Sequence, residues 1–551
     1  MAKLSPQQAE AALREAVTLH RQGQLAAAEK IYARILKSYP DQFDALHLSG
    51  MAKLQNGKAG EAQRLIAAAL KVAPGSADAH ANMGLVLGAL QRPADALTSF
   101  DKALGIEPAH FEALANRGNV LLDLGRSADA LACFDTVLAR EPRHLPARVN
   151  RANALVALGR ADEAIAEYDA ALAMAPNDVK AAFNRANALF RAGRYADALT
   201  GFDRLLSAMP NHVEALTTRG QTRQALGRHE DALADYAKAI ALNKDSVEAH
   251  FNEALALLTV GDYARGFAEY EWRWKRPGIA RRSFGKPLWL GEYPLGRKTI
   301  LLHAEQGLGD TIQFARYAPM LAREGAKVVL EVQPELKALL AGLEGVTVLA
   351  RGEPLPAFDV HTPLGSLPLA LKTVPANVPA AIPYLHADPA RVDAWRPHLE
   401  ALPGKRVAIA WAGNPAHIND RNRSVALSRL KSMFDAPGVS FVSIQRDLRD
   451  GDAELIRDLP PLTHLGAELA DFYETAVVVS LCDLVITVDT AVAHLAGALG
   501  RPVWILVPSW PDWRWTLNSD TSPWYPNAKL FRQGASGDWD SVIARLRQKI
   551  V

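Results

Sequence analysis

The sequence predicts an α-helical solenoid followed by an α/β region of two Rossmann-like lobes. Three observations support this fold class. A period of 34 residues runs through residues 9–275, and from residue 298 onward short apolar strands alternate with helical segments. A Pro-rich passage at 371–389 divides that alternation into two blocks. A long fixed period is typical of repeat architectures, and strand–helix alternation is typical of parallel sheets covered by helices.

Several residue types carry the period of the first region. Prolines recur every 34 residues, at Pro40, Pro74, Pro108, Pro142, Pro176 and Pro210. Alanines keep the same spacing, each with a large side chain four residues later, at Ala28, Ala62, Ala96, Ala130, Ala164, Ala198 and Ala232. Small residues such as Gly84 and Gly118 recur where two helices need to approach closely. We therefore expect consecutive helix pairs.

This pattern resembles the tetratricopeptide repeat. The resemblance covers roughly residues 9–275 in about eight units, and the last unit is irregular because Gly266 replaces the packing alanine. It implies a superhelix over residues 1–275 with a long concave groove, since stacked helix pairs bury their core between neighbours. Residues 276–297, dense in aromatic and basic side chains, are predicted to be the linker that docks the solenoid onto the next domain.

A series of asparagines marks the predicted groove. They recur at one position of the units, at Asn82, Asn116, Asn150, Asn184 and Asn252. Asparagine is a mediocre helix former, and its amide offers both a donor and an acceptor to the backbone of an extended peptide. Alternatively, the asparagines bond one another between adjacent repeats. The series resembles the asparagine ladder of the eukaryotic O-GlcNAc transferase, which implies a protein acceptor in the groove.

The α/β region is predicted to form an acceptor-side lobe over residues 298–390 and a donor-binding lobe over 391–551. The expected strands lie at 298–305, 326–333, 346–351 and 358–364 in the first lobe, and at 405–414, 439–447, 483–490 and 501–508 in the second. The final helix, DWDSVIARLRQKIV, is expected to cross back to the first lobe. Open α/β sheets bind ligands at the carboxyl ends of their strands, so polar loops at those ends are the candidate sites.

Three such loops carry candidate residues. The first holds Gly307, Gly309 and Asp310, the second holds Asn414, His417, Arg421, Arg423 and Ser424, and the third holds Asp489, Thr490 and His494. The first loop lacks the third glycine of a dinucleotide fingerprint and the Gly-Lys-Ser/Thr of a P-loop, which excludes both. Helix N-termini combined with arginines form anion sites, so two of these loops facing one cleft would hold a nucleotide phosphate.

These residues resemble bacterial tetratricopeptide-repeat glycosyltransferases whose catalytic half is similar to the heptosyltransferases. The turn GLGD (307–310) matches the family's Gly-Asp turn, and VDTAVAH (488–494) matches its donor signature except at Ala491, where the family usually has glycine. The resemblance implies a GT-B fold with a nucleotide sugar on the C-terminal lobe and no catalytic metal or other cofactor. It also implies that Asp310 is the base, although an Asp-x-x-Gln helix cap with Gln313 explains the same residue.

Composition excludes several other classes. A net charge of +2 gives no indication of nucleic acid or of an acidic membrane surface as a partner. The run at 476–488 is too short to span a membrane and contains Asp483, and two distant cysteines fit a reducing compartment, so we expect a cytoplasmic protein.

The predicted function is transfer of a sugar from a nucleotide donor to a Ser/Thr hydroxyl of a protein held by the repeats. Resemblance alone implies flagellin as one acceptor. A glycan- or lipid-directed transferase and an inactive protein-binding scaffold are the alternatives.

Overall fold

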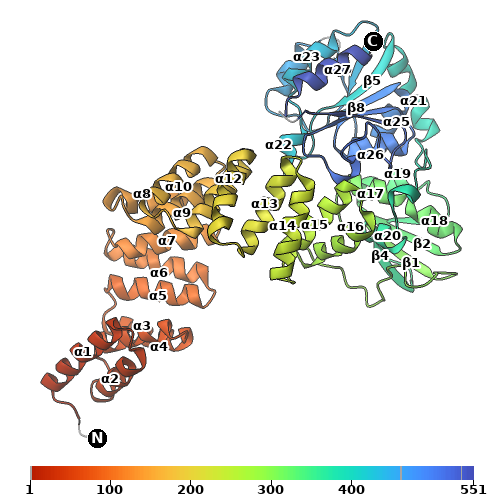
Figure 1. Cartoon of the computed structure of the whole chain (residues 1–551). Coiled ribbons are helices and arrows are strands. Elements are labelled where there is room, and N and C mark those ends of the chain that lie inside the picture. The colour runs from red at the N-terminus through yellow and green to blue at the C-terminus, as the bar shows by residue number, and fades with distance from the viewer. Residues whose placement is uncertain (1–2, 418, 460–461, 535–536, 551) are drawn as a thin grey trace. The chain divides into compact units, whose positions relative to one another are not determined.

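The computed structural model describes residues 3–417, 419–459, 462–534 and 537–550 of the chain. These residues form two compact units that divide after Ala208. The first unit contains helices alone, and the second contains the last helices of the solenoid together with two parallel sheets (Figure 1). The fold class predicted from the sequence is confirmed, and the α/β part is consistent with a GT-B type domain.

The first unit consists of helix pairs in which each helix packs on the next. Its helices are α1 (Pro6–Arg21), α2 (Leu25–Ser38), α3 (Phe43–Gln55), α4 (Ala59–Val72), α5 (Ala77–Ala89), α6 (Pro93–Ile106), α7 (Phe111–Asp123), α8 (Ser127–Arg140), α9 (Leu145–Ala157), α10 (Ala161–Met174), α11 (Val179–Arg191) and α12 (Tyr195–Ala208). The period of the sequence therefore appears as a repeated pair of short helices.

A left-handed residue ends the first helix of most pairs. Gly57 and Gly125 have φ of 74° and 73°, values that only glycine adopts without steric cost. In the third pair Gln91 takes the same conformation, with φ of 58°. Stacking with the neighbouring pairs thus imposes the turn even where the sequence lacks glycine.

The small residues of the period lie where a large side chain crosses a helix. A Cβ atom added to Gly84 would lie 2.6 Å from Phe100, and one added to Gly118 would lie 2.7 Å from Phe134. Both aromatic rings are buried. The prediction that these positions permit close approach of two helices is therefore confirmed.

The second unit begins with four more helices and a short 3-10 helix. These are α13 (Val213–Ala225), α14 (His229–Leu242), α15 (Val247–Val260), α16 (Tyr263–Tyr270) and η1 (Glu271–Lys275). Tyr263 on α16 packs against the rings of Trp513 and Trp524, and Trp524 Nε1 donates to its hydroxyl at 3.1 Å. The end of the solenoid is thus built into the α/β part by aromatic packing.

The first sheet has the strand order β3-β2-β1-β4, and all of its pairs are parallel. Its elements are β1 (Thr299–His303), α17 (Leu308–Ala315), α18 (Tyr317–Arg323), β2 (Lys327–Val332), α19 (Pro334–Leu340), β3 (Val346–Ala350), β4 (Val360–Pro363), η2 (Leu364–Ser366), α20 (Leu367–Ala370) and η3 (Pro375–Asn377). The described residues between η1 and β1 form neither helix nor strand, and Phe284 of this linker packs on His303 and His361.

The second sheet has the order β10-β9-β8-β5-β6-β7 and is also parallel. Its elements are α21 (Pro389–Glu400), β5 (Lys405–Ala410), α22 (Asp420–Arg423), α23 (Leu427–Phe434), β6 (Val439–Ser443), α24 (Asp452–Arg457), β7 (Leu462–His464), α25 (Phe472–Leu481), β8 (Leu484–Val488), α26 (Ala491–Ala498), β9 (Val503–Val507), η4 (Trp513–Trp515), β10 (Ala528–Arg532) and α27 (Asp540–Ile550).

Successive strand residues of the second sheet face different helices, as the pleat of a strand requires. Ala408 belongs to the core cluster shared with α25 and α26, whereas Ile409 belongs to the cluster shared with α23 and α27. The final helix α27 therefore covers the second sheet, and the prediction that it crosses back to the first lobe is wrong. Its apolar face packs with Leu430 and Met433 of α23, in a core cluster whose described members include no residue of the first lobe.

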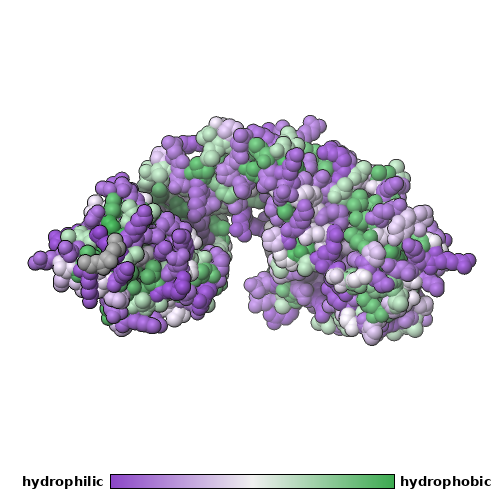
Figure 2. Space-filling model, turned by 90° about the horizontal axis from the view of Figure 1, so that it is seen from below, coloured by the Kyte–Doolittle hydropathy of each residue, from purple (hydrophilic) through white to green (hydrophobic). Residues whose placement is uncertain are grey.

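The surface of the molecule is mainly hydrophilic, as expected when most apolar residues pack in the interior. On the face seen in Figure 2, hydrophilic residues predominate and hydrophobic residues are interspersed among them. Among the residues that the structure describes, no helix has both the length and the apolar character needed to cross a membrane.

Candidate functional site

Each sheet has a switch point, where the chain returns to the first strand of the sheet and adds the next strand on its other side. In the second sheet this switch point lies between β5 and β8, and in the first it lies between β1 and β4. Ligands of open α/β sheets bind outside the carboxyl ends of such strands. The three predicted loops follow β1, β5 and β8, so the topology brings all of them to these edges.

The loop after β5 is held by a network around Asp420. The Ser424 hydroxyl donates to Asp420 Oδ1 at 2.9 Å and accepts from Gly413 N at 3.1 Å. Arg449, which the sequence analysis missed, donates to Gly413 O at 2.7 Å and forms an ion pair with Asp420 at 2.5 Å. Ser424 thus shapes the loop, and Arg449 adds a second arginine beside it.

Arg423 connects this loop to the loop after β8. Its Nη1 donates to the backbone carbonyl of Asp489 at 2.9 Å, and its side chain is 12% exposed. Thr490 is the N-cap residue of α26 and has extended backbone, so the first amides of α26 point out beside this arginine. An arginine and a helix N-terminus therefore meet at the second switch point.

The other candidates of the β5 loop lie at the surface. Asn414, His417 and Arg421 are exposed. Asn414 Oδ1 accepts from Ala416 N at 2.9 Å, and His417 Nδ1 accepts from Asn419 N at 3.2 Å. Both side chains therefore stabilise the local turn in this structure.

Asp489 is surrounded by charges of both signs. Burial and the neighbouring Asp512 raise the pKa of Asp489 to about 6, although Arg423 and Arg514 act in the opposite direction. This carboxyl group therefore keeps its proton to a higher pH than a surface aspartate does.

His494 lies in an aromatic pocket at the contact between the lobes. It is 5% exposed, its ring stacks on Trp515, and its Nδ1 is 3.0 Å from the Tyr525 hydroxyl. Burial lowers the pKa of His494 well below its usual value, so the ring is neutral. A Cβ atom added to Gly309 would lie 2.8 Å from this ring, which explains the glycine of the first turn.

Asp310 has both of its carboxylate oxygens occupied. Gly307 N donates to Oδ2 at 3.0 Å, and Arg514 of the second lobe forms an ion pair with Oδ1. Asp310 is therefore the third residue of α17 in a cap that begins at Gly307, and the predicted Asp-x-x-Gln cap with Gln313 is wrong. Arg514 is almost fully buried and also bonds Gln313 and Asp512. The first turn is therefore fastened to the second lobe by one arginine that the sequence analysis overlooked inside an aromatic cluster.

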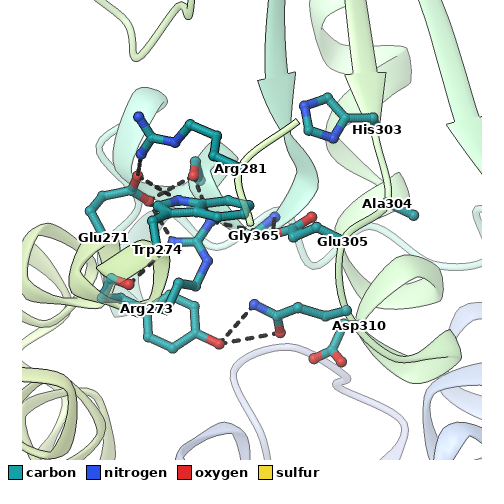
Figure 3. A network of polar contacts seen from close by, with 12 residues as sticks. Glu271, Arg273, Trp274, Arg281, His303, Ala304, Glu305, Asp310 and Gly365 are labelled. Atoms are coloured by element: carbon teal, nitrogen blue, oxygen red, sulfur yellow. Dashed lines mark hydrogen bonds and ion pairs between the residues drawn. The ribbon is translucent and has the colours of Figure 1, made fainter. Parts of the chain in front are cut away.

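A second carboxylate, Glu305, lies at the switch point of the first sheet. Its Oε1 accepts from Gly365 N, in the 3-10 helix η2 that follows β4, at 3.0 Å and from Arg273 Nη2 at 3.2 Å. Figure 3 shows Glu305 beside Gly365 and Arg273, with Asp310 near this network but not bonded to it. The sequence analysis missed Glu305, although its position two residues after β1 was the available signal.

Arg273 brings the end of the solenoid into this site. It is 3% exposed, and it donates to Glu271 Oε1 at 2.6 Å and to Ser366 Oγ at 2.7 Å. Its guanidinium lies between the rings of Tyr270 and Trp274, at 4.8 and 4.5 Å from their centroids (Figure 3). Burial and, to a smaller extent, Asp310 raise the pKa of Glu305 to about 7, although Arg273 acts in the opposite direction.

The asparagines of the repeats bond one another in the centre of the first unit. Asn150 Nδ2 donates to Asn119 Oδ1 at 2.8 Å, and Asn184 Nδ2 donates to Asn153 Oδ1 at 3.0 Å. Asn82 bonds His47 in the preceding pair. The interpretation that asparagines bond one another between adjacent repeats is confirmed for Asn150 and Asn184 but not for Asn82, whose partner is a histidine. Asn116 is partly exposed.

Asn252 differs from the rest of the series. It is 6% exposed, and its Oδ1 accepts from Gln221 Nε2 at 3.0 Å. The prediction that Asn252 lines an open groove is wrong, because this residue of α15 is buried against Gln221 of α13.

Comparison with known families agrees with the two parts of the fold. One tetratricopeptide repeat (TPR) family matches residues 2–43, 47–113, 115–179 and 149–213, and a second TPR family matches residues 220–261. Residues 453–534 match glycosyltransferase family 9 (heptosyltransferase). The chain therefore combines tetratricopeptide repeats with a heptosyltransferase-like domain, and this match supports a glycosyltransferase.

The matched segment includes Asp489, Thr490, His494 and Arg514, whereas the loops after β1 and β5 lie outside it. A curated relative, Protein FlbA of Caulobacter vibrioides, is 26% identical over 334 residues. The match spans 54% of each chain, about half the length of that relative.

Among the solved structures that resemble part of this chain are two tetratricopeptide repeat proteins. A tetratricopeptide repeat protein from Parabacteroides merdae is 21% identical, with a TM-score of 0.37, and the match covers 45% of this chain and 98% of that one. A thermophilic TPR protein of Thermus thermophilus is 26% identical, with a TM-score of 0.29 and coverage of 33% and 99%.

Proposed function

We propose that the protein transfers a sugar from a nucleotide-activated donor to a serine or threonine hydroxyl of a protein acceptor, using a GT-B pair of lobes. One observation carries this proposal most directly. Helices α17 and α26, which follow β1 and β8, meet where Gly309 of the first lobe packs against the His494 ring of the second. A donor on the second lobe and an acceptor on the first would therefore come together at one place.

The donor side has the chemistry to hold a phosphate. Arg423 lies next to the N-terminus of α26, and Arg449 lies in the same loop network. Fixed positive charge of this kind stabilises a leaving phosphate, so the proposal needs no metal ion. The buried side of this proposed site is formed by Asp489, Thr490 and His494. The exposed loop after β5 carries Asn414, His417 and Arg421.

The acceptor side is proposed to combine the repeats with the carboxylates of the first switch point. Partly exposed amides such as that of Asn116 suit an extended polypeptide backbone, which presents alternating donors and acceptors. Each such hydrogen bond contributes about 1 kcal/mol net, so binding should be weak and tolerant of sequence. One of the two carboxylates, Asp310 or Glu305, must then accept the proton of the acceptor hydroxyl.

A binding screen of the full chain against nucleotides and nucleotide sugars tests the donor side. A ligand at about 100 times its Kd stabilises the folded state by about 2.7 kcal/mol, which raises Tm measurably. We expect one nucleotide class to bind and Arg423→Met to weaken its binding by about 10-fold or more, because a hydrogen bond to a charged group contributes about 1.5–3 kcal/mol.

Arg429→Met is the matched control for this screen. Arg429 is a half-exposed arginine of the same lobe, paired with Asp540 at 2.9 Å and placed on α23 outside the candidate loops. Its replacement should leave the nucleotide affinity unchanged. Absence of binding by every nucleotide would favour the protein-binding scaffold instead.

A further inference from the structure

Two carboxylates stand on the acceptor side, and their surroundings differ. Asp310 accepts from Gly307 N with one oxygen and from Arg514 with the other. Glu305 uses only Oε1, for Gly365 N and Arg273, and among the described residues no group donates to Oε2. A general base needs a lone pair within reach of the proton that it removes, and Glu305 has one available.

Glu305 is also held in place from two directions. Gly365 N donates to it from η2, and Arg273 donates to it from the end of the solenoid. A Cβ atom added to Gly365 would lie 2.6 Å from Glu305 Oε1, so the glycine is what allows this contact. The carboxylate is thus positioned without having both of its oxygens occupied.

We propose that Glu305, rather than Asp310, is the catalytic base that takes the proton of the acceptor hydroxyl. This assignment rests on the proposed transferase function. In the step, the hydroxyl oxygen forms a bond to the anomeric carbon of the sugar while its O–H bond breaks and the proton passes to Glu305 Oε2. The bond between the anomeric carbon and the phosphate oxygen breaks, and the nucleotide phosphate leaves with that electron pair.

The charges around Glu305 suit this role. Arg273, at the end of the solenoid, donates to Glu305 and also to Glu271. Asp310 on α17 lies close enough to Glu305 to raise its pKa and is itself paired with Arg514. A base is most effective when its pKa lies near the working pH, and burial brings the pKa of Glu305 to about 7. Asp310, paired with Arg514, then acts as a positioning residue that fastens the first turn to the second lobe.

The test compares Glu305→Gln with Asp310→Asn in the full chain. The donor found by the binding screen is supplied with a peptide rich in serine and threonine, and the transfer rate is measured from pH 5 to 9, a range of about two units either side of the pKa of about 7. Positioned base catalysis contributes about 10²–10⁴-fold, so we expect Glu305→Gln to lower kcat by about 10²-fold or more while donor affinity stays within about threefold.

The pH profile separates a base from a structural residue. The wild type should lose activity below about pH 7 as Glu305 is protonated, and Asp310→Asn should keep that acidic limb even where its rate is lower. The limb should be absent in Glu305→Gln. Persistence of the limb in Glu305→Gln, or its loss in Asp310→Asn, would overturn the assignment.

A second variant guards against a folding defect. Glu305→Ala leaves a space at the base, so added formate should restore part of the rate if a carboxylate is the missing group. Failure of formate to restore any rate in a folded Glu305→Ala protein, as judged by its unchanged nucleotide binding, counts against the assignment. Absence of any transfer by the wild type would overturn the proposed function itself, together with this step.

Discussion

The repeats and the α/β part pair their polar side chains in different ways. In the repeats, a polar group bonds its counterpart about one repeat away, as Asn150 does with Asn119 and Asn82 with His47. In the α/β part, the partners come from distant segments, as Arg273 bonds Ser366 and Arg514 bonds Asp310. The first kind of pair recurs along the surface, whereas the second kind is buried and occurs at one place.

This difference separates a binding surface from a reaction site. Repetition distributes weak contacts over equivalent positions, so the loss of one contact changes little. The charges of a buried ion pair are shielded from water, so removing one partner leaves the other charge unpaired and poorly solvated. We therefore expect large effects from substitutions at the switch points and small effects from substitutions in the repeats.

The largest effect on stability is expected for Arg273→Met. The substitution leaves Glu271 and Glu305 without their buried partner, which should lower the free energy of unfolding by about 3–5 kcal/mol. Calorimetry of the full chain measures this loss. Arg281→Met is the control, since Arg281 is 40% exposed and pairs with Glu271 at 3.4 Å, a contact that contributes about 0–1 kcal/mol. Equal losses in both variants would contradict the distinction between buried and exposed pairs.

A smaller effect, with a definite sign, is expected from His303. Burial, His361 and nearby arginines lower the pKa of His303 to about 3, against an ordinary value near 6.5. The unfolded chain therefore binds a proton below pH 6.5 that the folded chain does not bind, so stability is lost as the pH falls. Between pH 6.5 and 4.5 this group should cost about 2–3 kcal/mol, which His303→Phe should remove.

Denaturation curves at several pH values check the prediction for His303, and the exposed His386→Phe is the control that should not alter the pH dependence of stability. An unchanged pH dependence in His303→Phe would show that the ring is not buried in its neutral form.

The contribution of Glu305 to stability depends on pH in the opposite direction. Its pKa is raised to about 7, so its contribution to stability is lost as the pH rises from 4.5 to 7, and Glu305→Gln should be relatively more stable above pH 7.

The smallest effects are expected in the repeats. Asn153 accepts from the buried Tyr168 hydroxyl at 2.5 Å and from Asn184, so Asn153→Ala should lower the free energy of unfolding by about 1–3 kcal/mol. Asn116→Ala should change stability by less than about 0.5 kcal/mol and weaken binding of an extended peptide by several-fold. Melting curves and peptide titration distinguish the two variants. If neither variant binds the peptide more weakly than the wild type, the support for a peptide groove is removed.

The elements of the solenoid could be predicted because every contact that forms them recurs at a fixed spacing. Gln91 marks the limit of that approach, since only its place in the period indicates a left-handed residue. The final helix was placed on the wrong lobe because an amphipathic pattern gives the buried face of a helix but not the partner of that face. Val542 and Leu546 pack with α23, which precedes them by more than a hundred residues.

The candidate site was predictable where its residues follow strands and was missed where they pair over long range. Arg423, Thr490 and His494 lie at strand ends and were found. Arg514 was hidden among the tryptophans of η4, and nothing near it in the sequence indicates its bond to Asp310, since the partner lies some two hundred residues earlier. Arg273 was missed for the same reason, because its partners Glu305 and Ser366 belong to different loops.

The measurement that tests the central claim most directly is the intact mass of a serine- and threonine-rich peptide incubated with the full chain and the donor that binds it. The account predicts that the peptide gains the mass of one sugar residue as free nucleotide appears, and that Glu305→Gln and Arg423→Met nearly abolish this gain. Transfer of the sugar to a glycan or lipid, with the peptide unmodified under the same conditions, would contradict it.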